Sequence, residues 1–378
     1  MLYQKILNLD KIERVYDDVK KTTRHKSKIV NFESFYITNV MSIYEILKSK
    51  NFKHQKYNIF LYREKKYRLI MSECLTDKII NHLISEEVLL PLIEPKLIDT
   101  NVATRRGKGT SFGIKYLKKY INKIKVNNPN FYILQLDVKK YFYNIDHEIV
   151  MSKLKNLIDD EDVLNILEEI LGTTNRLETN VRIKDEINKE IDRLKKSSNP
   201  HINEKIKELK EIPYYNLNKG IPIGNMTSQI IAVYYLNDLD HFIKEKLHIK
   251  YYIRYMDDLI LLHEDEEYLK YCYKKIKEFL AKEKLELNMR KTHIYSIKNG
   301  ISFLGYRFLL NKNNKLVIIM NSKTKKRISK RLRYFRHNNK AKYNTSLSSY
   351  QGYFNMCDCY SFIEKNKFYK LEVWIWIK

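Results

Sequence analysis

Hydrophobic residues recur every three to four positions in several parts of this sequence, which is the spacing of one face of an α-helix. In residues 1–50 the repeat includes Ile12, Val15 and Val19, separated by charged residues. Similar repeats predict helices over residues 79–84, 114–124 and 230–247. We therefore expect a helical N-terminal lobe and further helices along the chain.

Short runs of aromatic and aliphatic residues, bounded by polar positions, predict β-strands between the helices. Residues 60–62 and 67–71 are two such runs on either side of a basic tip at residues 63–66, and so predict a hairpin. A third run, residues 131–136, ends at Asp137. We expect this run to present an acidic side chain at the end of a buried strand.

A second hairpin is expected from the runs at residues 251–254 and 259–262. Asp257 and Asp258 lie in the turn between them. Two carboxylates held at a turn could bind hard divalent cations through oxygen. Adjacent aspartates are also ordinary turn residues, because Asp tolerates tight turns and bonds its own backbone, so the pair alone does not decide between the two readings.

Two later segments are dominated by charge. Residues 176–213 combine charges with a helical repeat that breaks near residues 197–200, and they predict a helical hairpin inserted outside the main core. Residues 322–342 predict a basic helix. Charge runs usually form solvated faces, but the uniform sign here favours contact with a nucleic-acid backbone. The cations expected in this contact are Lys326, Arg327, Lys330 and Arg331.

The composition strengthens the prediction of a polyanionic partner. In 378 residues, 71 Lys and Arg stand against 45 Asp and Glu, a formal net charge of +26. A nucleic acid is the leading candidate and would bind with strong salt dependence, while a compositional bias towards lysine is the alternative explanation. The hydrophobic content of 44% is enough for a substantial core, in one multi-lobed body or in several domains.

Neither a cysteine-based metal site nor a membrane segment is expected. Cys74, Cys272, Cys357 and Cys359 lack paired CxxC spacing, so they indicate no zinc site and no disulfide framework. No apolar run is long enough to cross a membrane, and the first residues contain no apolar segment typical of an export signal. We therefore expect a cytoplasmic protein without a membrane partner.

A basic segment with two glycines precedes the helix expected at residues 114–124. It spans residues 104–111 and contains Arg105, Arg106 and Lys108. Backbone amides and cations in such a segment suit phosphate contact, although a solvated basic loop explains it equally well. The GxxxxGK[ST] spacing of a P-loop is absent from the sequence.

Asp137 supplies a third acid that changes the interpretation of Asp257 and Asp258. If the strand ending at Asp137 neighbours the later hairpin in one sheet, the three carboxylates could share two metal ions. Two ions about 4 Å apart would stabilise the attacking and leaving oxygens of an in-line phosphoryl transfer. Mg²⁺ is the expected ion, with Mn²⁺ as a substitute, because carboxylates and phosphates suit its oxygen coordination.

The order of these motifs resembles that of a reverse transcriptase, specifically the bacterial class related to group II intron enzymes. The residues Tyr255-Met256-Asp257-Asp258 match the YxDD box of that family, and residues 136–147 match its LDxxxxFxxIDH motif. The resemblance implies an RNA-directed DNA polymerase with an α+β, right-hand architecture of fingers, a palm with an antiparallel sheet, and a helical thumb. The expected boundaries are 1–130 for the N-terminal helices and fingers, 131–321 for the palm with some finger elements and the insertion at 176–213, and 322–378 for the basic thumb.

The resemblance also implies roles for individual residues. The expected catalytic acids and metal ligands are Asp137, Asp257 and Asp258. Lys291 is the candidate general acid for pyrophosphate departure, with a plain surface lysine as the alternative. Phe142 stands where the family places an aromatic ring under the sugar, which implies a preference for deoxynucleotides. The other residues expected at the nucleotide are Lys66, Arg68, Val138, Tyr141, Ile223, Gly224 and Gln229, and those expected at the primer grip are Phe303, Leu304, Gly305 and Tyr306.

The segment GIPIGNMTSQ, residues 220–229, narrows the resemblance. It is similar to the corresponding segment in the reverse transcriptases of diversity-generating retroelements, whereas most group II-like enzymes carry a glutamine where Ile223 stands. An aliphatic side chain cannot make the polar contact of an amide to the nucleotide, so we expect looser discrimination of the base pair. The resemblance implies error-prone synthesis, with errors opposite template adenines.

Two alternatives stay open. Antiviral-defence reverse transcriptases share GxPIGxxxSQ-like motifs, and the length of the charged insertion leaves the subclass undecided. An RNA-binding, maturase-like scaffold is the alternative outside catalysis, but the three intact acids favour an enzyme. The expected partners are an RNA template, a DNA or RNA primer and dNTPs, together with a small basic helical accessory protein or a dedicated non-coding RNA.

Overall fold

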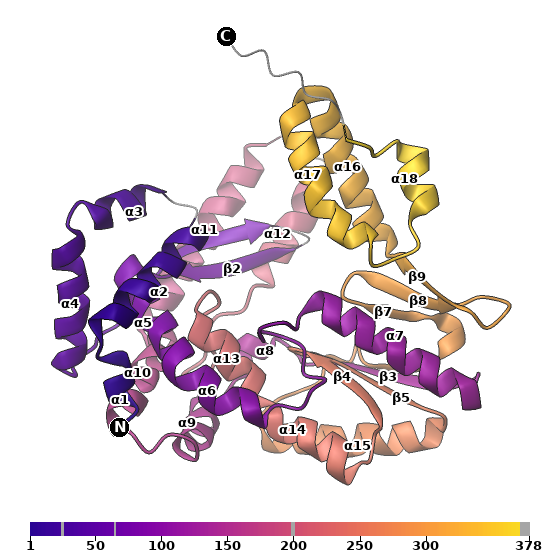
Figure 1. Ribbon diagram of the computed structural model, residues 1–378, viewed down its shortest axis with the longest axis horizontal. Helices are drawn as coiled ribbons and strands as arrows, with labels where there is room; N and C mark the ends of the chain where they lie inside the picture. The colour runs from indigo at the N-terminus through magenta and orange to yellow at the C-terminus, as the bar shows by residue number, and fades with distance from the viewer. Residues whose placement is uncertain (24–25, 64–65, 198–200, 371–378) are drawn as a thin grey trace. The chain divides into compact units, whose positions relative to one another are not determined.

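The computed structural model describes residues 1–23, 26–63, 66–197 and 201–370 (Figure 1). The chain forms two compact units whose segments alternate along the sequence. Because the two units are interleaved along the sequence, they do not correspond one to one to the predicted fingers, palm and thumb. The predicted boundaries of these domains stay predictions. The first unit contains Met1–Ile98, Val138–Phe242 and Lys277–Leu287, and the second contains Asp99–Asp137, Ile243–Ile276 and Asn288–Lys378.

The first unit opens with helices that agree with the hydrophobic repeat in residues 1–50. The repeat is the buried face of α2, where Ile12, Val15 and Val19 are inaccessible to solvent. Asn8 caps this helix, because its side-chain oxygen accepts a hydrogen bond from the backbone N–H of Lys11. The predicted helical pattern is confirmed. The helices are α1 (Tyr3–Ile6), α2 (Leu9–Thr22), α3 (Lys26–Glu33) and α4 (Tyr36–Lys48).

The first predicted hairpin consists of β1 (Asn58–Arg63) and β2 (Tyr67–Ser72), which pair antiparallel along their whole length. Residues 64–65 of the predicted basic tip lie outside the described residues. On β2, Leu69 is buried and Arg68 is exposed, because successive side chains of a strand point to opposite faces. The hairpin therefore has one covered face and one open face.

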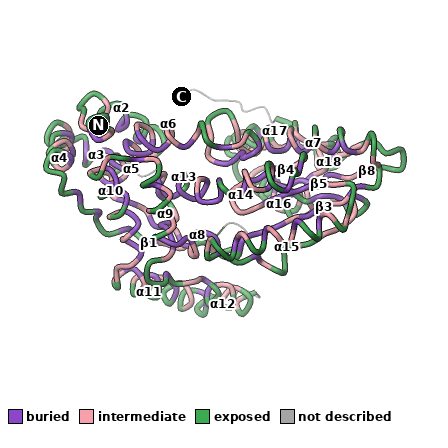
Figure 2. Tube along the Cα trace, turned by 90° about the horizontal axis from the view of Figure 1, so that it is seen from below, coloured by how far each residue is buried: buried purple, intermediate pink, exposed green. Residues whose placement is uncertain are grey.

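The charged segment at residues 176–213 contains two of the helices in the described part of the chain, α11 (Leu177–Lys195) and α12 (Ile202–Lys210). Most of the predicted break at residues 197–200 lies outside the described residues. The expectation that this segment is an insertion outside the main core stays a prediction. Its apolar residues share a hydrophobic cluster with the first hairpin, and this cluster is distinct from the one that contains the core of the second unit. Exposed positions follow the other faces of both helices (Figure 2). The cluster includes Ile183, Ile187, Leu194 and Leu209 from the helices and Ile59, Leu69 and Met71 from the hairpin.

The remaining elements of the first unit are helical. The helix predicted at residues 79–84 is α5 (Leu75–Ile84). The helix predicted at residues 230–247 begins earlier and is divided into α13 (Met226–Tyr235), α14 (Asn237–His241) and η4 (Phe242–Lys246). The first unit ends at the first residue of η4, and the rest of η4 belongs to the second unit. The others are η1 (Ser85–Leu89), α6 (Leu90–Ile93), η2 (Glu94–Lys96), α8 (Tyr141–Asn144), α9 (His147–Lys155), α10 (Glu161–Gly172) and η3 (Thr173–Asn175).

The second unit is built around an antiparallel sheet with strand order β4-β5-β3-β6. Helix α7 (Thr110–Asn127) lies along this sheet (Figure 1). Its Ile114, Leu117 and Ile121 are in one hydrophobic cluster with Ile133 and Ile260 of the strands. The central strands are buried over most of their length. The strands are β3 (Tyr132–Asp137), β4 (Tyr251–Tyr255), β5 (Asp258–His263) and β6 (His293–Ser296), and α15 (Glu266–Lys282) follows β5.

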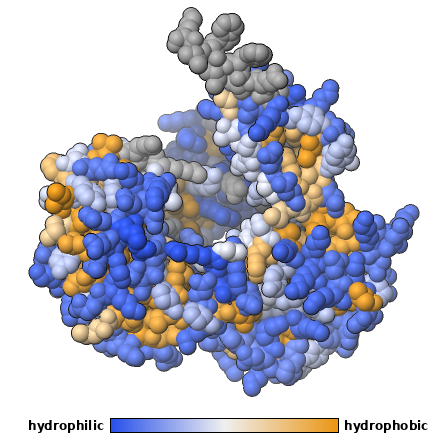
Figure 3. Space-filling model, in the orientation of Figure 1, coloured by the Kyte–Doolittle hydropathy of each residue, from blue (hydrophilic) through white to orange (hydrophobic). Residues whose placement is uncertain are grey.

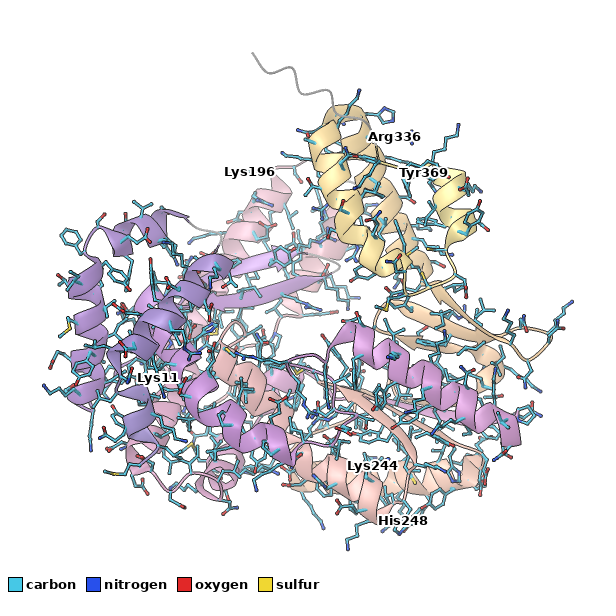
Figure 4. All side chains as sticks on the ribbon, viewed as in Figure 1. Lys11, Lys196, Lys244, His248, Arg336 and Tyr369 are labelled. Carbon is cyan, nitrogen blue, oxygen red and sulfur yellow. The ribbon has the colours of Figure 1, made fainter. Side chains whose placement is uncertain are left out.

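The C-terminal part of the second unit is a smaller sheet followed by helices. The predicted basic helix at residues 322–342 is confirmed as α16, although it ends at Asn338 and α17 follows. Arg336, labelled in Figure 4, donates a hydrogen bond from Nη1 to the carbonyl oxygen of Lys367 at 3.0 Å and so ties α16 to the chain beyond α18. The elements are β7 (Ile301–Phe303), β8 (Tyr306–Leu310), β9 (Leu316–Met320), η5 (Ile297–Asn299), α16 (Ser322–Asn338), α17 (Lys340–Phe354) and α18 (Tyr360–Asn366).

All strand pairs of the sheets are antiparallel. Among the described residues, no helix has both the length and the apolar character needed to cross a membrane. Helices and antiparallel sheets together form the predicted α+β fold.

Candidate active site

The turn between β4 and β5 is held by a buried arginine. Tyr255 pairs with Asp258 across the hairpin, which leaves Met256 and Asp257 as the turn residues. Met256 has a φ of +55°, a left-handed conformation that residues other than glycine rarely adopt. Arg254 is fully buried at 0% exposure, and its Nη1 donates a hydrogen bond to the carbonyl oxygen of Met256 at 3.0 Å. This bond helps to hold the backbone of the acidic turn in place.

Asp137 and Asp258 lie opposite each other on the two central strands. Asp137 is the last residue of β3 and Asp258 is the first residue of β5, and the antiparallel register pairs their Cα positions. Asp137 is only 4% exposed. The expectation that the two acidic segments neighbour each other in one sheet is confirmed, whereas the chemical role of the acids stays a prediction.

The acids affect each other's ionisation. Burial, followed by the negative charges of Asp257 and Asp137, raises the pKa of Asp258 to about 7, and Lys291 opposes this rise. Lys291 Nζ lies 2.5 Å from Asp137 Oδ1. Burial alone would lower the pKa of Lys291, but the hydrogen bond and the charge of Asp137 outweigh it and raise the pKa. Lys291 is therefore positively charged at neutral pH, and its charge lies next to the acid pair formed by Asp137 and Asp258.

Asn288 is a site residue to which the sequence interpretation gave no role. Its Nδ2 donates a hydrogen bond to Asp137 Oδ2 at 3.0 Å, and its backbone N–H donates to the carbonyl oxygen of Asp137 at 2.7 Å. The N–H of Lys291 donates to the carbonyl oxygen of Asn288 at 2.9 Å, so one short turn delivers both side chains to Asp137. The sequence signal is an asparagine three residues before Lys291. The signal for Arg254, the other omission, is a single cation within an apolar run.

A family model for reverse transcriptases (RNA-dependent DNA polymerases) matches residues 46–308, well over half of the chain, and this match includes both acidic segments. The chain belongs to the reverse transcriptase family. Among solved structures, it is similar to a telomerase from Candida albicans in complex with a TWJ fragment of telomeric RNA, with 15% sequence identity and a TM-score of 0.46. That match covers 84% of this chain and 59% of the telomerase chain. No curated protein matches the sequence. The family match confirms the predicted reverse transcriptase family and its polymerase fold, whereas the predicted subclass, related to group II intron enzymes, stays a prediction.

The acids of this reverse transcriptase suit a divalent cation by their chemistry. Carboxylate oxygens are ligands that Mg²⁺ prefers. Burial and then the charges of Asp257 and Asp137 raise the pKa of Asp258, and a bound cation would oppose this rise. Within the described part of the chain, no group of three or more His, Cys, Asp or Glu side chains could hold a metal ion as arranged. Both carboxylate oxygens of Asp137 are bonded to Lys291 and Asn288. The metal roles of Asp137, Asp257 and Asp258 therefore stay predictions.

In the first unit of the reverse transcriptase, backbone hydrogen bonds join segments that were predicted to bind the nucleotide. The N–H of Met71 on β2 donates to the carbonyl oxygen of Ile223 at 2.8 Å, and the N–H of Ile221 donates to that of Phe142 at 2.8 Å. Arg68 is exposed, and Phe142 and Ile223 are half-buried. These three side chains are therefore accessible to a ligand, and their role stays a prediction.

The other residues predicted at the nucleotide differ in exposure. Lys66 and Gln229 are exposed. Val138 and Tyr141 are 1% and 2% exposed, and the Tyr141 hydroxyl donates to the carbonyl oxygen of Ala232 at 2.5 Å. The side chains of Val138 and Tyr141 pack inside the first unit, so these residues could contact a nucleotide only through their backbone atoms.

Gly224 allows the close approach of its loop to β2. A Cβ atom at this position would lie 2.4 Å from the carbonyl oxygen of Met71, and the residue has a φ of +144°. Both observations require glycine, since other residues rarely adopt this conformation and would clash with the strand.

The predicted primer grip is the turn between β7 and β8. Phe303 and Tyr306 are 3% and 2% exposed and belong to the core of the second unit. Leu304, with a φ of +49°, and Gly305, with a φ of +89°, form the turn itself and are half-buried. Of these four residues, Leu304 and Gly305 are therefore the ones that could contact a primer, whereas Phe303 and Tyr306 pack in the core.

The cations predicted to contact phosphates include exposed and internally paired residues. Arg106 is exposed. Lys108 Nζ donates to the carbonyl oxygen of Asp99 at 3.0 Å, and Arg105 Nη1 donates to that of Asn101 at 3.2 Å. Along α16 the exposed cations are Lys326, Lys330 and Arg331, and Arg327 is half-buried.

Proposed function

We propose that this chain is an RNA-directed DNA polymerase that extends a primer along an RNA template. The observation that carries the proposal is the register pairing of Asp137 with Asp258, together with the bond from Lys291 to Asp137. Membership of the reverse transcriptase family supports the same reaction. In this reaction the 3′-hydroxyl of the primer attacks the α-phosphate of a dNTP, and pyrophosphate leaves.

The residues around the acid pair have distinct tasks in this proposal. Asp137, Asp257 and Asp258 would hold two Mg²⁺ ions, which supply positive charge where oxygens become more negative in the transition state. Lys291 is protonated and held at the acids, so it can donate a proton to the departing pyrophosphate. Arg68 would bind the triphosphate through charge-assisted hydrogen bonds.

Primer extension with a matched aspartate control tests the proposal. Asp258→Asn should lower the rate of dNTP incorporation by about a thousandfold or more, because the charge stabilisation at such a site is worth several kcal/mol. Asp192→Asn replaces an aspartate of α11 whose side chain is 66% exposed, and it should retain the wild-type rate. Extension by Asp258→Asn at the wild-type rate would contradict the proposal. Chelation should stop the wild type, and added Mg²⁺ or Mn²⁺ should restore it.

We further propose that synthesis is error-prone, as in diversity-generating retroelements. The proposal is supported by the identity of Ile223 and by its half-buried position beside β2. Ile223→Gln should lower the frequency of errors opposite template adenines, whereas Ile223→Val should retain the wild-type error spectrum. The measurement is deep sequencing of cDNA from a defined RNA template. An unchanged spectrum for Ile223→Gln would count against the subclass and leave the polymerase proposal intact.

The same GxPIGxxxSQ pattern supports the alternative of an antiviral-defence reverse transcriptase. The genomic neighbourhood separates the two. A nearby template repeat with an adenine-mutated variable copy would favour mutagenesis, with an accessory protein or non-coding RNA as partner, and a free-standing defence locus would favour the alternative.

A further inference from the structure

Polar contacts connect the insertion helices α11 and α12 to the strand that carries Arg68. Tyr67 precedes Arg68 at the start of β2. Its backbone N–H donates a hydrogen bond to Glu208 Oε1 of α12 at 2.5 Å, and its hydroxyl donates to Glu190 Oε1 of α11 at 2.8 Å. One residue of the hairpin is therefore bonded to both helices of the insertion.

The two glutamates are partly shielded from water and are themselves held in place. The side chain of Glu190 is 15% exposed and that of Glu208 is 19% exposed. Glu190 also pairs with Arg193 at 3.0 Å, and Glu208 lies 3.8 Å from Arg63 of β1. Burial and the hydrogen bond to Glu190 raise the pKa of Tyr67 to about 12, so its hydroxyl stays a donor at neutral pH. Hydrogen bonds to charged acceptors of this kind are stronger than neutral ones.

The outer edge of β2 is held at its other end as well. N–H groups four residues apart in a strand point to the same edge. Tyr67 donates to Glu208, and Met71 donates to the carbonyl oxygen of Ile223 at 2.8 Å. The edge that does not pair with β1 is thus bonded near both ends, by the insertion at one and by the loop of Ile223 at the other.

Packing agrees with these polar contacts. Apolar residues of α11 and α12 cluster with Leu69 and Met71 on one face of the hairpin, and Arg68 on the other face is exposed. A hairpin of two strands is marginally stable by itself and needs packing against another element. The insertion supplies that packing on the face that contains Leu69. The opposite face, which contains Arg68, is not covered by this cluster.

We propose that α11 and α12 form a clasp that fixes the orientation of Arg68, with Tyr67, Glu190 and Glu208 as positioning residues. This inference rests on the proposed function, because it takes Arg68 to bind the incoming nucleotide. A hairpin held in one conformation before binding loses less conformational freedom when Arg68 engages a triphosphate. The clasp therefore acts on the affinity for dNTP and leaves the chemical step unchanged.

Single-turnover incorporation on a primed RNA template tests the clasp. Glu208→Ala should weaken the apparent affinity for dNTP by about tenfold or more, the effect of one lost hydrogen bond to a charged acceptor, with the maximal rate unchanged. Glu208→Gln keeps an acceptor for the N–H of Tyr67 and should restore most of the affinity. Glu186→Gln alters a carboxylate of α11 that pairs with Lys189 on the same helix at 2.7 Å, and it should behave as wild type.

A double-mutant cycle with Arg68→Ala shows whether the clasp acts through that residue. In the Arg68→Ala background, Glu208→Ala should cause no further loss of affinity, whereas independent effects would multiply. Multiplied effects, or wild-type affinity in either single variant, would overturn the inference. Thermal unfolding of each variant identifies any that misfold, and for those Tyr67→Phe provides a milder test. Failure of the polymerase proposal can be distinguished from failure of this inference. In that case Asp258→Asn would extend the primer at the wild-type rate, whatever the effect of Glu208→Ala.

Discussion

At the scale of single residues, the acid pair depends on neighbours that bond its backbone and its side chains. Asn288 and Lys291 both contact Asp137, and Arg254 bonds the left-handed residue of the acidic turn. The contacts of Asn288 and Arg254 each join a motif residue to a residue to which the sequence analysis gave no role. Substitution of single residues can distinguish a residue that takes part in the reaction from one that has only a structural role.

Lys291→Ala is expected to lower the maximal rate of incorporation by about a hundredfold, because a positioned general acid contributes at least that much. The apparent affinity for dNTP should change little. Rapid-quench measurements of single incorporation provide both values. Lys298→Ala, an exposed lysine of the same unit, should match wild type. A Lys291→Ala rate within about twofold of wild type would assign it to the surface-lysine alternative.

Phe142→Ala is expected to increase incorporation of ribonucleotides relative to deoxynucleotides by about ten- to hundredfold, because removal of the ring relieves a steric clash worth about 1–3 kcal/mol. Phe142→Tyr retains the ring and should keep the wild-type preference. Competition between rNTP and dNTP on one template measures the ratio. An unchanged ratio for Phe142→Ala would assign the ring to packing alone.

At the scale of elements, the first unit is organised around the edges and faces of one hairpin. Strand β2 pairs with β1 on one edge, bonds Glu208 and Ile223 on the other, and packs against α11 and α12 through its buried face. The loop of Ile223 can approach this strand because Gly224 has no Cβ atom. The fit between loop and strand is therefore sensitive to one methyl group.

Gly224→Ala is expected to lower the melting temperature by about 4–8 °C, because the new Cβ atom meets the Met71 carbonyl oxygen and the backbone conformation is strained. Incorporation of dNTP should fall with it. The matched control is Gly172→Ala at the end of α10, where a Cβ would meet nothing within 4 Å; it should be neutral or slightly stabilising. Equal melting temperatures for the two variants would show that the loop adapts.

At the scale of the whole molecule, we expect the excess of cations to favour the binding of a polyanion. The formal net charge is +26, and hydrophilic residues prevail over the face shown in Figure 3. On α16, Lys326, Lys330 and Arg331 are exposed, whereas Arg105 and Lys108 donate hydrogen bonds to backbone carbonyl oxygens of the chain itself. When exposed cations bind phosphates, counterions are released from the nucleic acid. The salt dependence of the binding constant therefore reports the number of phosphate contacts.

Replacement of Lys326, Lys330 and Arg331 by alanine is expected to weaken binding of a primed RNA template and to reduce the slope of log Kd against log salt by about 1 for each lost phosphate contact. A control with equal loss of charge replaces the exposed Lys184, Lys195 and Lys207 of the insertion. Fluorescence anisotropy over a range of salt concentrations gives both slopes. Equal reductions would indicate that net charge, and no contact by α16, governs binding.

The sequence by itself determined the elements and the chemistry of the motifs. Period-3.6 and period-2 patterns identified the N-terminal helices, the two hairpins and the strand ending at Asp137, because these patterns reflect which side of each element is buried. The motifs around Asp137 and Asp258 identified the family, since their order along the chain is preserved whatever the packing.

Only the tertiary structure decided which of these elements meet. The register that pairs Asp137 with Asp258, the bond from Asn288 to Asp137 and the contact of Tyr67 with α11 and α12 all join residues distant in sequence. Local patterns do not encode such pairs, because they depend on strand register and on the burial of one element against another. For the same physical reason the charged insertion could be recognised as helical from its sequence, but its attachment to the hairpin could not.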